Sequence, residues 1–267
     1  MFLNKFSLII TTRCNLNCEY CCEYIPEHKP FPDMTVDEAE KIISTMFNVI
    51  ERINTLHITG GGEPFIHPQL AEIINITMKY MIKFDRLMLF TNSVTAIKDD
   101  VFDLLRKHKD KIVVQMSLYG INPGREKKIV ELIQSSGVEC KIEKYYGNDQ
   151  SFGGWVDFGV WESYARAPSE LECVFRNCAI TRHMSGNWRT RNGKVHWCSR
   201  SQRGMELGLI PNNPDDYVDL FDETSFDDKR GKFQQIAESR YITACDYCSG
   251  DQGTTDVGKR IPAAVQI

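Results

Sequence analysis

Residues 6–21 read FSLIITTRCNLNCEYC, and this stretch decides how the rest of the chain is interpreted. It opens with an apolar, β-rich run that predicts a strand over Phe6–Thr12. Cys14, Cys18 and Cys21 follow on a single loop, separated by three and by two residues. Cysteines gathered this closely usually bind a metal or do redox work. We therefore expect a metal site at the end of the first strand.

The spacing of these cysteines favours an iron–sulfur cluster. Three thiolates on one loop can bind three irons of a 4Fe–4S cubane and leave the fourth iron without a protein ligand. An open coordination position is typical of a metal site that binds a substrate. Zinc and buried free thiols are the alternatives, and zinc would need a fourth ligand, for which His28 is the nearby candidate. Cys22 is expected to point away from the site and not to be a ligand.

Strands and helices alternate through the first half of the chain, which predicts a parallel sheet covered by helices. The predicted strands are Phe6–Thr12, Leu56–Thr59, Leu87–Phe90, Ile112–Leu118 and Val138–Glu143. The predicted helices are Val36–Ile53, Leu70–Lys83, Val101–His108 and Arg125–Ser136. Polar, glycine-rich and cysteine-rich groups recur where successive strands end, as they do in barrels that place their sites there. The α/β fold is therefore expected to be a partial TIM-like (β/α) barrel over residues 1–150.

The amino-acid composition and net charge exclude several classes of protein. The 267 residues are 42% hydrophobic and 25% charged, as in an ordinary globular protein. A net charge of −4 argues against nucleic-acid and membrane-surface proteins, because both need a basic face. No apolar run could span a bilayer and the N-terminus does not resemble a signal peptide, so we expect a cytoplasmic location. The cytosol keeps thiols reduced, so ten cysteines predict metal sites rather than disulfides.

The second half of the sequence has a different pattern and composition. Its helical periodicity is weak, and it contains all four tryptophans of the chain. Residues 151–267 are expected to form a small irregular domain held together by a metal centre. Asn192-Gly193 predicts a β-hairpin whose second strand leads to a cysteine. Four thiolates could bind tetrahedral zinc or a fully ligated 4Fe–4S cluster. The predicted ligands are Cys178, Cys198, Cys245 and Cys248, with Cys173 as the alternative first ligand.

A second motif accompanies the first cysteines. Tyr20 precedes the third cysteine, and Thr59 leads into three glycines, Glu63 and Pro64. Together these residues resemble the radical S-adenosylmethionine (SAM) superfamily, whose signature is Cys-x3-Cys-x-aromatic-Cys followed by a Gly-Gly-Glu-Pro loop. The resemblance implies that Tyr20 lies against the adenine of SAM and that Gly61, Gly62 and Glu63 meet its methionine amino group.

Two further strand-end residues fit the resemblance less specifically. Asn92 and Ser117 occupy positions where related enzymes contact the methionine carboxylate or the ribose hydroxyls of SAM. Ordinary turn residues at strand ends are the alternative for both.

The resemblance also implies a reaction. One electron from the open cluster, supplied by a donor such as flavodoxin or ferredoxin, splits SAM into methionine and a 5′-deoxyadenosyl radical. The radical then takes a hydrogen atom from the substrate, while the protein positions the reactants.

The later cysteines resemble the short auxiliary-cluster domain called Twitch, a relative of SPASM, in which four cysteines bind a second 4Fe–4S cluster. Such a cluster would accept an electron, so the expected net reaction is a two-electron oxidation of a sugar- or cyclitol-like substrate, as in enzymes of the 2-deoxy-scyllo-inosamine dehydrogenase type. The alternative is peptide modification by crosslinking or epimerisation, against which the absence of an evident leader-recognition domain weighs. An iron–sulfur electron carrier is the third possibility, but it would need no SAM loop.

Several residues remain without a predicted role. The arginine-rich stretch 182–191 is expected to be a solvated hairpin face. The alternative is that it supplies a base or anchors a phosphate or carboxylate. Cys22, Cys140 and Cys173 are expected to be buried small side chains, with hydrogen-atom donation to a radical as the alternative.

Overall fold

The computed structural model describes residues 1–59, 61–184, 186–250 and 260–267, and the side chains of 182–184 are outside the description. Gly60 of the glycine loop and the Arg182 side chain therefore lie outside it. The strands are β1 (Phe2–Ile9), β2 (Arg52–Thr59), β3 (Phe84–Thr91), β4 (Ile112–Leu118), β5 (Glu139–Lys144), β6 (Trp155–Val156), β7 (Trp188–Thr190), β8 (Lys194–His196), β9 (Tyr217–Asp219) and β10 (Arg260–Ile261). The helices are α1 (Val36–Val49), α2 (Leu70–Met78), α3 (Asp99–Lys107), α4 (Pro123–Ser135), α5 (Pro168–Asn177), α6 (Ala179–Met184), α7 (Ser199–Glu206) and α8 (Phe226–Ala237).

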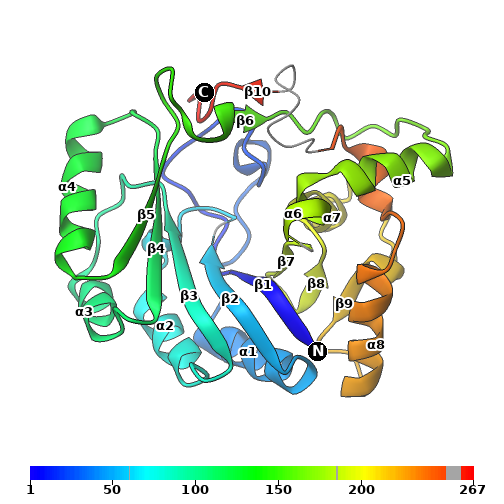
Figure 1. Ribbon diagram of the computed structural model, residues 1–267, viewed down its shortest axis with the longest axis horizontal. Coiled ribbons are helices and arrows are strands. Elements are labelled where there is room, and N and C mark those ends of the chain that lie inside the picture. Colours follow the sequence, from blue (N-terminus) through cyan, green and yellow to red (C-terminus); the bar gives the residue numbers. More distant parts are fainter. Residues whose placement is uncertain (60, 185, 251–259) are drawn as a thin grey trace.

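One eight-stranded sheet organises the fold, with the order β5-β4-β3-β2-β1-β7-β8-β9. β1 to β5 pair parallel with one another, and β7 pairs parallel with β1. The β7–β8 and β8–β9 pairs are antiparallel. Helices α1 to α4 connect successive parallel strands and cover the outer side of the sheet (Figure 1). The predicted α/β partial barrel is confirmed. All parallel strands end at the same edge, and the first cysteine loop follows β1 there.

Local sequence explains the elements that support this edge. Helix α1 begins with a capping box, in which the Thr35 hydroxyl accepts from the Glu38 amide and Glu38 accepts from the Thr35 amide. Its apolar face buries Ile42, Ile43 and Met46 in the core that the sheet shares. The observed strands β1, β2 and β3 begin three to four residues earlier than the apolar pattern predicted. Polar residues interrupt the pattern there, but ladder pairing continues through them.

The chain beyond residue 150 contains more regular structure than the sequence predicted. Its described residues form four helices, α5 to α8, so the expectation of an irregular region is wrong in this respect. The expected hairpin is confirmed, because β7 and β8 pair antiparallel around Gly193, whose φ is 88°. β7 also pairs with β1, so the main sheet continues into this half of the chain. No helix among the described residues is both long enough and apolar enough to cross a bilayer.

Candidate functional site

The first cysteine loop leaves the end of β1 near the middle of the sheet. The Cys14 sulfur accepts hydrogen bonds from the Leu16 amide at 3.4 Å and from Asn92 Nδ2 at 3.8 Å. The Cys18 sulfur accepts from Gln266 Nε2 at 3.1 Å. Burial raises the pKa of the Cys14 thiol to about 11 and that of Cys21 to about 12. These thiols therefore stay protonated at neutral pH unless a bound cation stabilises their thiolates.

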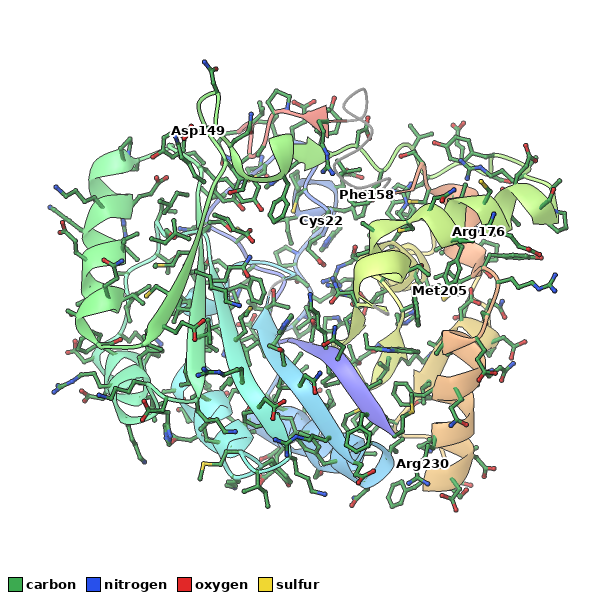
Figure 2. The ribbon with its side chains drawn as sticks, in the orientation of Figure 1. Cys22, Asp149, Phe158, Arg176, Met205 and Arg230 are labelled. Carbon is green, nitrogen blue, oxygen red and sulfur yellow. The ribbon has the colours of Figure 1, made fainter. Side chains whose placement is uncertain are left out.

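Two neighbours of this loop differ in exposure. Tyr20 adopts a left-handed backbone with φ 59° and keeps 44% of its surface exposed, so its ring is free to contact a ligand. The Cys22 side chain is exposed, and Glu23, Cys21 and Arg189 are near it. Figure 2 shows Cys22 near the centre of the molecule, above the upper ends of the strands. The sequence expected a buried side chain here, which the structure contradicts.

The glycine loop packs against the chain that carries Cys14. The Gly62 amide donates to the Thr11 carbonyl at 3.0 Å, and the Glu63 amide donates to the Arg13 carbonyl at 2.8 Å. A Cβ atom on Gly62 would lie 1.8 Å from the Arg13 carbonyl oxygen, closer than any real contact. The glycine therefore permits the close approach of one backbone segment to another, a reason that the sequence did not indicate.

Gly62→Ala is expected to displace the cysteine loop, because neither backbone segment can yield like a flexible side chain. We expect a loss of about 3 kcal/mol or more in the free energy of unfolding, together with reduced iron uptake. Gly124→Ala is the matched control, since a Cβ there meets nothing within 4 Å and the residue lies in α4. That control should be neutral or slightly stabilising in a denaturation experiment. Equal stability of the two variants would contradict the packing argument.

Glu63 joins the ends of two strands. One carboxylate oxygen accepts from the Phe65 amide at 3.1 Å and the other accepts from the Asn92 amide at 2.7 Å. Burial raises its pKa to about 7, and these hydrogen bonds oppose the shift. Pro64, directly after it, is buried at the start of a short 3-10 helix. Glu63 thus holds Asn92 in place, a structural role besides the ligand contact that the sequence predicted.

Asn92 and Ser117 lie at the same sheet edge but have different surroundings. Asn92 Nδ2 donates to the Asn15 side chain at 2.7 Å, so Asn92 is linked to the cysteine loop. Ser117 is hydrogen-bonded to the half-buried Tyr119 side chain, whose ring stacks on that of Tyr145 with a centroid separation of 5.6 Å. The structure therefore gathers Asn92 with the cysteines, whereas Ser117 belongs to an aromatic cluster further along the edge.

The later cysteines line a single cavity. Its wall contains Cys178 at the end of α5, Cys198 at the start of α7, and Cys245 with Cys248 near the C-terminus. Apolar side chains complete the wall, among them those of Phe175, Trp197 and Ile242. Cys173 does not line the cavity; it is exposed on α5, where Asn177 donates to its sulfur at 3.3 Å. The expectation of a buried Cys173 is therefore wrong.

A buried guanidinium adjoins this cavity. Arg200 lines it, is 4% exposed, and stacks on Trp161 at 3.5 Å from the ring centroid. Its hydrogen bonds go to the carbonyls of Tyr247 and of residues 159 and 160, and to the Tyr24 hydroxyl. Within the described part of the chain, no carboxylate lies within ion-pair distance of it. A buried cation without a carboxylate would suit this cavity if its four cysteines were bound as thiolates.

No three Cys, His, Asp or Glu side chains of the described residues are placed to hold a single metal ion. A 4Fe–4S cubane does not require its ligands to meet at a single ion, because each thiolate binds a separate iron.

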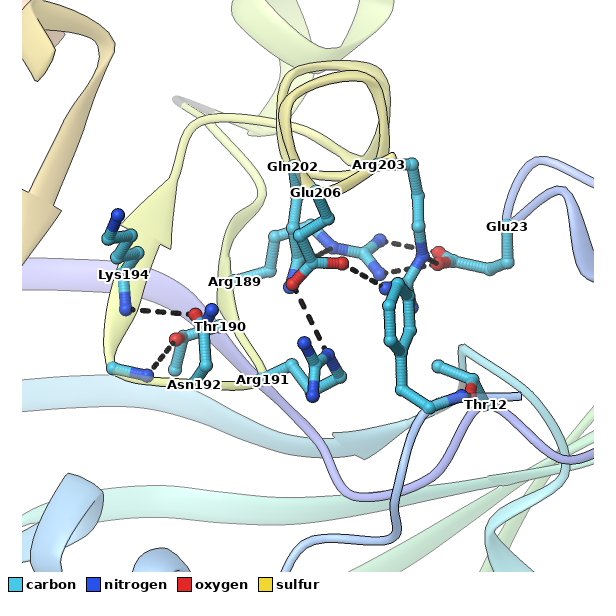
Figure 3. Close-up of polar contacts among 12 residues, drawn as sticks. Thr12, Glu23, Arg189, Thr190, Arg191, Asn192, Lys194, Gln202, Arg203 and Glu206 are labelled. Carbon is cyan, nitrogen blue, oxygen red and sulfur yellow. Dashed lines mark hydrogen bonds and ion pairs between the residues drawn. The ribbon is translucent and has the colours of Figure 1, made fainter. Parts of the chain in front are cut away.

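A buried network of charges links Glu23, which follows the first cysteines, to helix α7 (Figure 3). The Glu23 carboxylate pairs with Arg189 at 2.6 Å and with Arg203 at 3.1 Å. Arg203 also pairs with Glu206, and Arg191 pairs with Glu206 at 3.3 Å. Arg189 is 3% exposed, so the expectation of a solvated arginine face is wrong at this position. The network connects the cysteine loop after β1 to helix α7, which begins at Cys198.

Comparison with known proteins agrees with this geometry. Residues 8–136 match the model of the radical SAM superfamily. The chain is 33% identical over 114 residues to the antilisterial bacteriocin subtilosin biosynthesis protein AlbA of Bacillus subtilis (strain 168). That match covers 42% of this chain and 23% of AlbA, so the chain spans about a quarter of the length of this relative.

Two solved structures are similar over nearly the whole chain. anSMEcpe with bound AdoMet aligns with a TM-score of 0.54 and 14% identity, covering 99% of this chain and 92% of that one. BtrN in complex with AdoMet and 2-DOIA aligns with a TM-score of 0.50 and 12% identity, covering 99% and 98%. At such identities the likeness concerns the fold alone. The family model thus covers slightly less than half of the chain, and the solved structures show that nearly the whole chain shares their fold.

Proposed function

We propose that this chain is a radical SAM enzyme in which Cys14, Cys18 and Cys21 hold a 4Fe–4S cluster with one open iron. The observation that carries the proposal is the contact of the Gly62–Glu63 backbone with the cysteine loop, which unites the two sequence motifs at one sheet edge. With SAM bound and one electron added, such a cluster supplies a 5′-deoxyadenosyl radical that abstracts a hydrogen atom from substrate. The chain's own residues hold the loop, enclose the site and present Tyr20 to the ligand.

The test is the cleavage of SAM by the intact protein. Purified without oxygen, reduced with dithionite and mixed with SAM, the protein should form 5′-deoxyadenosine and methionine in equal amounts. Chromatography with mass detection measures both products. An iron-loaded protein that forms neither would contradict the proposal and would favour an electron carrier.

The four later cysteines are proposed to bind a second, fully ligated 4Fe–4S cluster. Their convergence on one apolar cavity beside Arg200 supports this assignment over zinc. We also propose that residues 1–150 carry the SAM site and residues 151–267 the second cluster. Because β7 pairs directly with β1, one sheet runs through both parts, and the division is one of function rather than of separate sheets. A cytoplasmic location and reduction by a flavodoxin or ferredoxin belong to the same proposal.

Replacing Cys245 and Cys248 together with alanine is expected to halve the iron content, from about eight to about four irons per chain. The remaining cluster should still respond to SAM in its electron paramagnetic resonance (EPR) spectrum. The matched control is Cys173→Ala, because Cys173 lies outside the cavity and should leave the iron content unchanged. Iron loss in the control but not in the double variant would overturn the assignment of ligands.

A net two-electron oxidation of a small sugar- or cyclitol-like molecule is the proposed reaction. A fully ligated second cluster has no position for substrate, so its natural role is to take an electron from a substrate radical. End-to-end similarity to BtrN, whose structure contains 2-DOIA, supports a small substrate. Deuterated aminocyclitols and amino sugars should transfer deuterium to 5′-deoxyadenosine if this class is correct.

Peptide modification is the second candidate, favoured by the sequence match to AlbA and by similarity to anSMEcpe crystallised with the Kp18Cys peptide, at a TM-score of 0.51. Deuterium transfer from labelled peptides, without transfer from the cyclitols, would select this candidate. The two assays therefore decide between the classes.

A further inference from the structure

The last residues of the chain pair with the first cysteine loop. Cys18 and Gln266 form an antiparallel β-bridge, and the Glu19 amide donates to the Val265 carbonyl at 2.7 Å. The Ile267 amide donates to the Asn17 carbonyl at 3.0 Å, and Asn17 Nδ2 returns a hydrogen bond to the Ile267 carbonyl at 2.8 Å. Figure 1 shows the C-terminus and β10 above the ends of the parallel strands. We call residues 264–267 the terminal segment.

The Gln266 carboxamide is oriented by its own contacts. Its Oε1 accepts from the Asn17 amide at 2.9 Å, and a backbone amide can only donate, so Oε1 must face Asn17. Nε2 then faces the Ala264 carbonyl at 2.8 Å and the Cys18 sulfur at 3.1 Å. The donor reaches the sulfur of a residue that is 7% exposed, 248 positions earlier in the chain. This geometry suits a thiolate better than a thiol, because hydrogen bonds to a charged acceptor are the stronger ones.

We infer that the terminal segment is part of the SAM-cleaving site and that Gln266 donates a hydrogen bond to the cluster-bound Cys18 thiolate. This inference rests on the proposed function. Reduction adds negative charge to a cluster and its sulfurs, so a donor to a ligand sulfur stabilises the reduced state and raises the reduction potential. Gln266 is therefore a positioning residue that makes the cluster easier to reduce before SAM is cleaved.

Gln266→Glu tests the inference with little change in shape. The variant keeps an oxygen for the Asn17 amide but replaces the donor to Cys18 with a second oxygen. We expect the fraction of SAM-responsive cluster that a fixed potential reduces to fall roughly fivefold or more, because the variant loses a donor whose charge-assisted hydrogen bond stabilises the more negative, reduced cluster. EPR redox titration of the intact protein measures this fraction, and the spectral change on adding SAM separates the open cluster from the second one.

Gln134→Glu on the exposed face of α4 is the matched control, because it makes the same charge change far from the cysteines and should titrate like the wild type. Gln266→Leu removes the donor without adding charge and should also lower the reduced fraction. Wild-type titrations for both Gln266 variants would overturn the inference. Loss of only the SAM-responsive cluster in both would support it, as the segment would then be needed to build the site. A wild-type protein without a SAM-responsive cluster would instead contradict the proposed function.

Discussion

Cys14→Ala, Cys18→Ala and Cys21→Ala are each expected to reduce the formation of 5′-deoxyadenosine to below detection. Each thiolate would hold a separate iron, so loss of one ligand leaves the open cluster unable to assemble or to bind SAM in the required orientation. Iron content should fall by about four per chain while the second cluster remains. Product analysis and iron determination on the same preparation check both expectations.

Cys22→Ala is the matched control for this series. It removes a thiol from the same loop, and Cys22 is accessible rather than held by neighbouring hydrogen-bond donors. The control should keep its iron and its SAM cleavage. If Cys22→Ala lost the open cluster and one of the other three variants kept it, the assignment of the ligands would be wrong.

Glu23→Gln is expected to cause the largest loss of stability among single substitutions in the charge network. Glu23 pairs with Arg189 and Arg203, whose side chains are 4% and 0% exposed. Three arginines already face two glutamates in this network, and the substitution would leave one buried carboxylate among them. Removing one partner of a buried ion pair typically costs about 3–5 kcal/mol. In a chain of this size the midpoint of thermal unfolding should fall by roughly 10 °C.

Glu27→Gln supplies the comparison. It makes the same chemical change four residues further on, where the side chain is exposed and forms no ion pair among the described residues. Its effect should stay within about 0.5 kcal/mol, as for ordinary surface substitutions. Thermal unfolding followed by circular dichroism measures both variants. Similar midpoints for the two would show that the network contributes little to stability.

The first half of the fold could be predicted from sequence because its signals are local. Helix α1 has both a capping box and an apolar face, and β4 is a mostly apolar run whose observed bounds are those that the sequence predicts. Helix α7 could not be predicted this way. Its sequence SRSQRGME is polar, yet Arg200, Gln202 and Arg203 are buried by specific partners rather than by hydrophobicity. Periodicity analysis has no signal for such a helix.

The residues of the candidate site also fall into those that the sequence predicts and those that it does not. The cysteines and the glycine loop were visible because short motifs carry them. Glu23, Arg200 and Gln266 were missed, since their roles depend on partners far away in sequence. Glu23 meets Arg189 across 166 positions, and Gln266 meets Cys18 across 248. Only the completed fold reveals that these side chains surround the two groups of cysteines.

The pairing of Gln266 with Cys18 has a consequence for biosynthesis. Ribosomes add roughly 5–20 residues per second, so about 12–50 s separate the synthesis of these two partners. During that interval the cysteine loop can acquire neither its β-bridge nor its side-chain donor. Iron delivered to the nascent chain would meet three thiols on a loop without this support. Productive assembly of the cluster is therefore expected to follow translation of the terminal segment, and the cell's iron–sulfur carriers would meet a folded recipient rather than an emerging one.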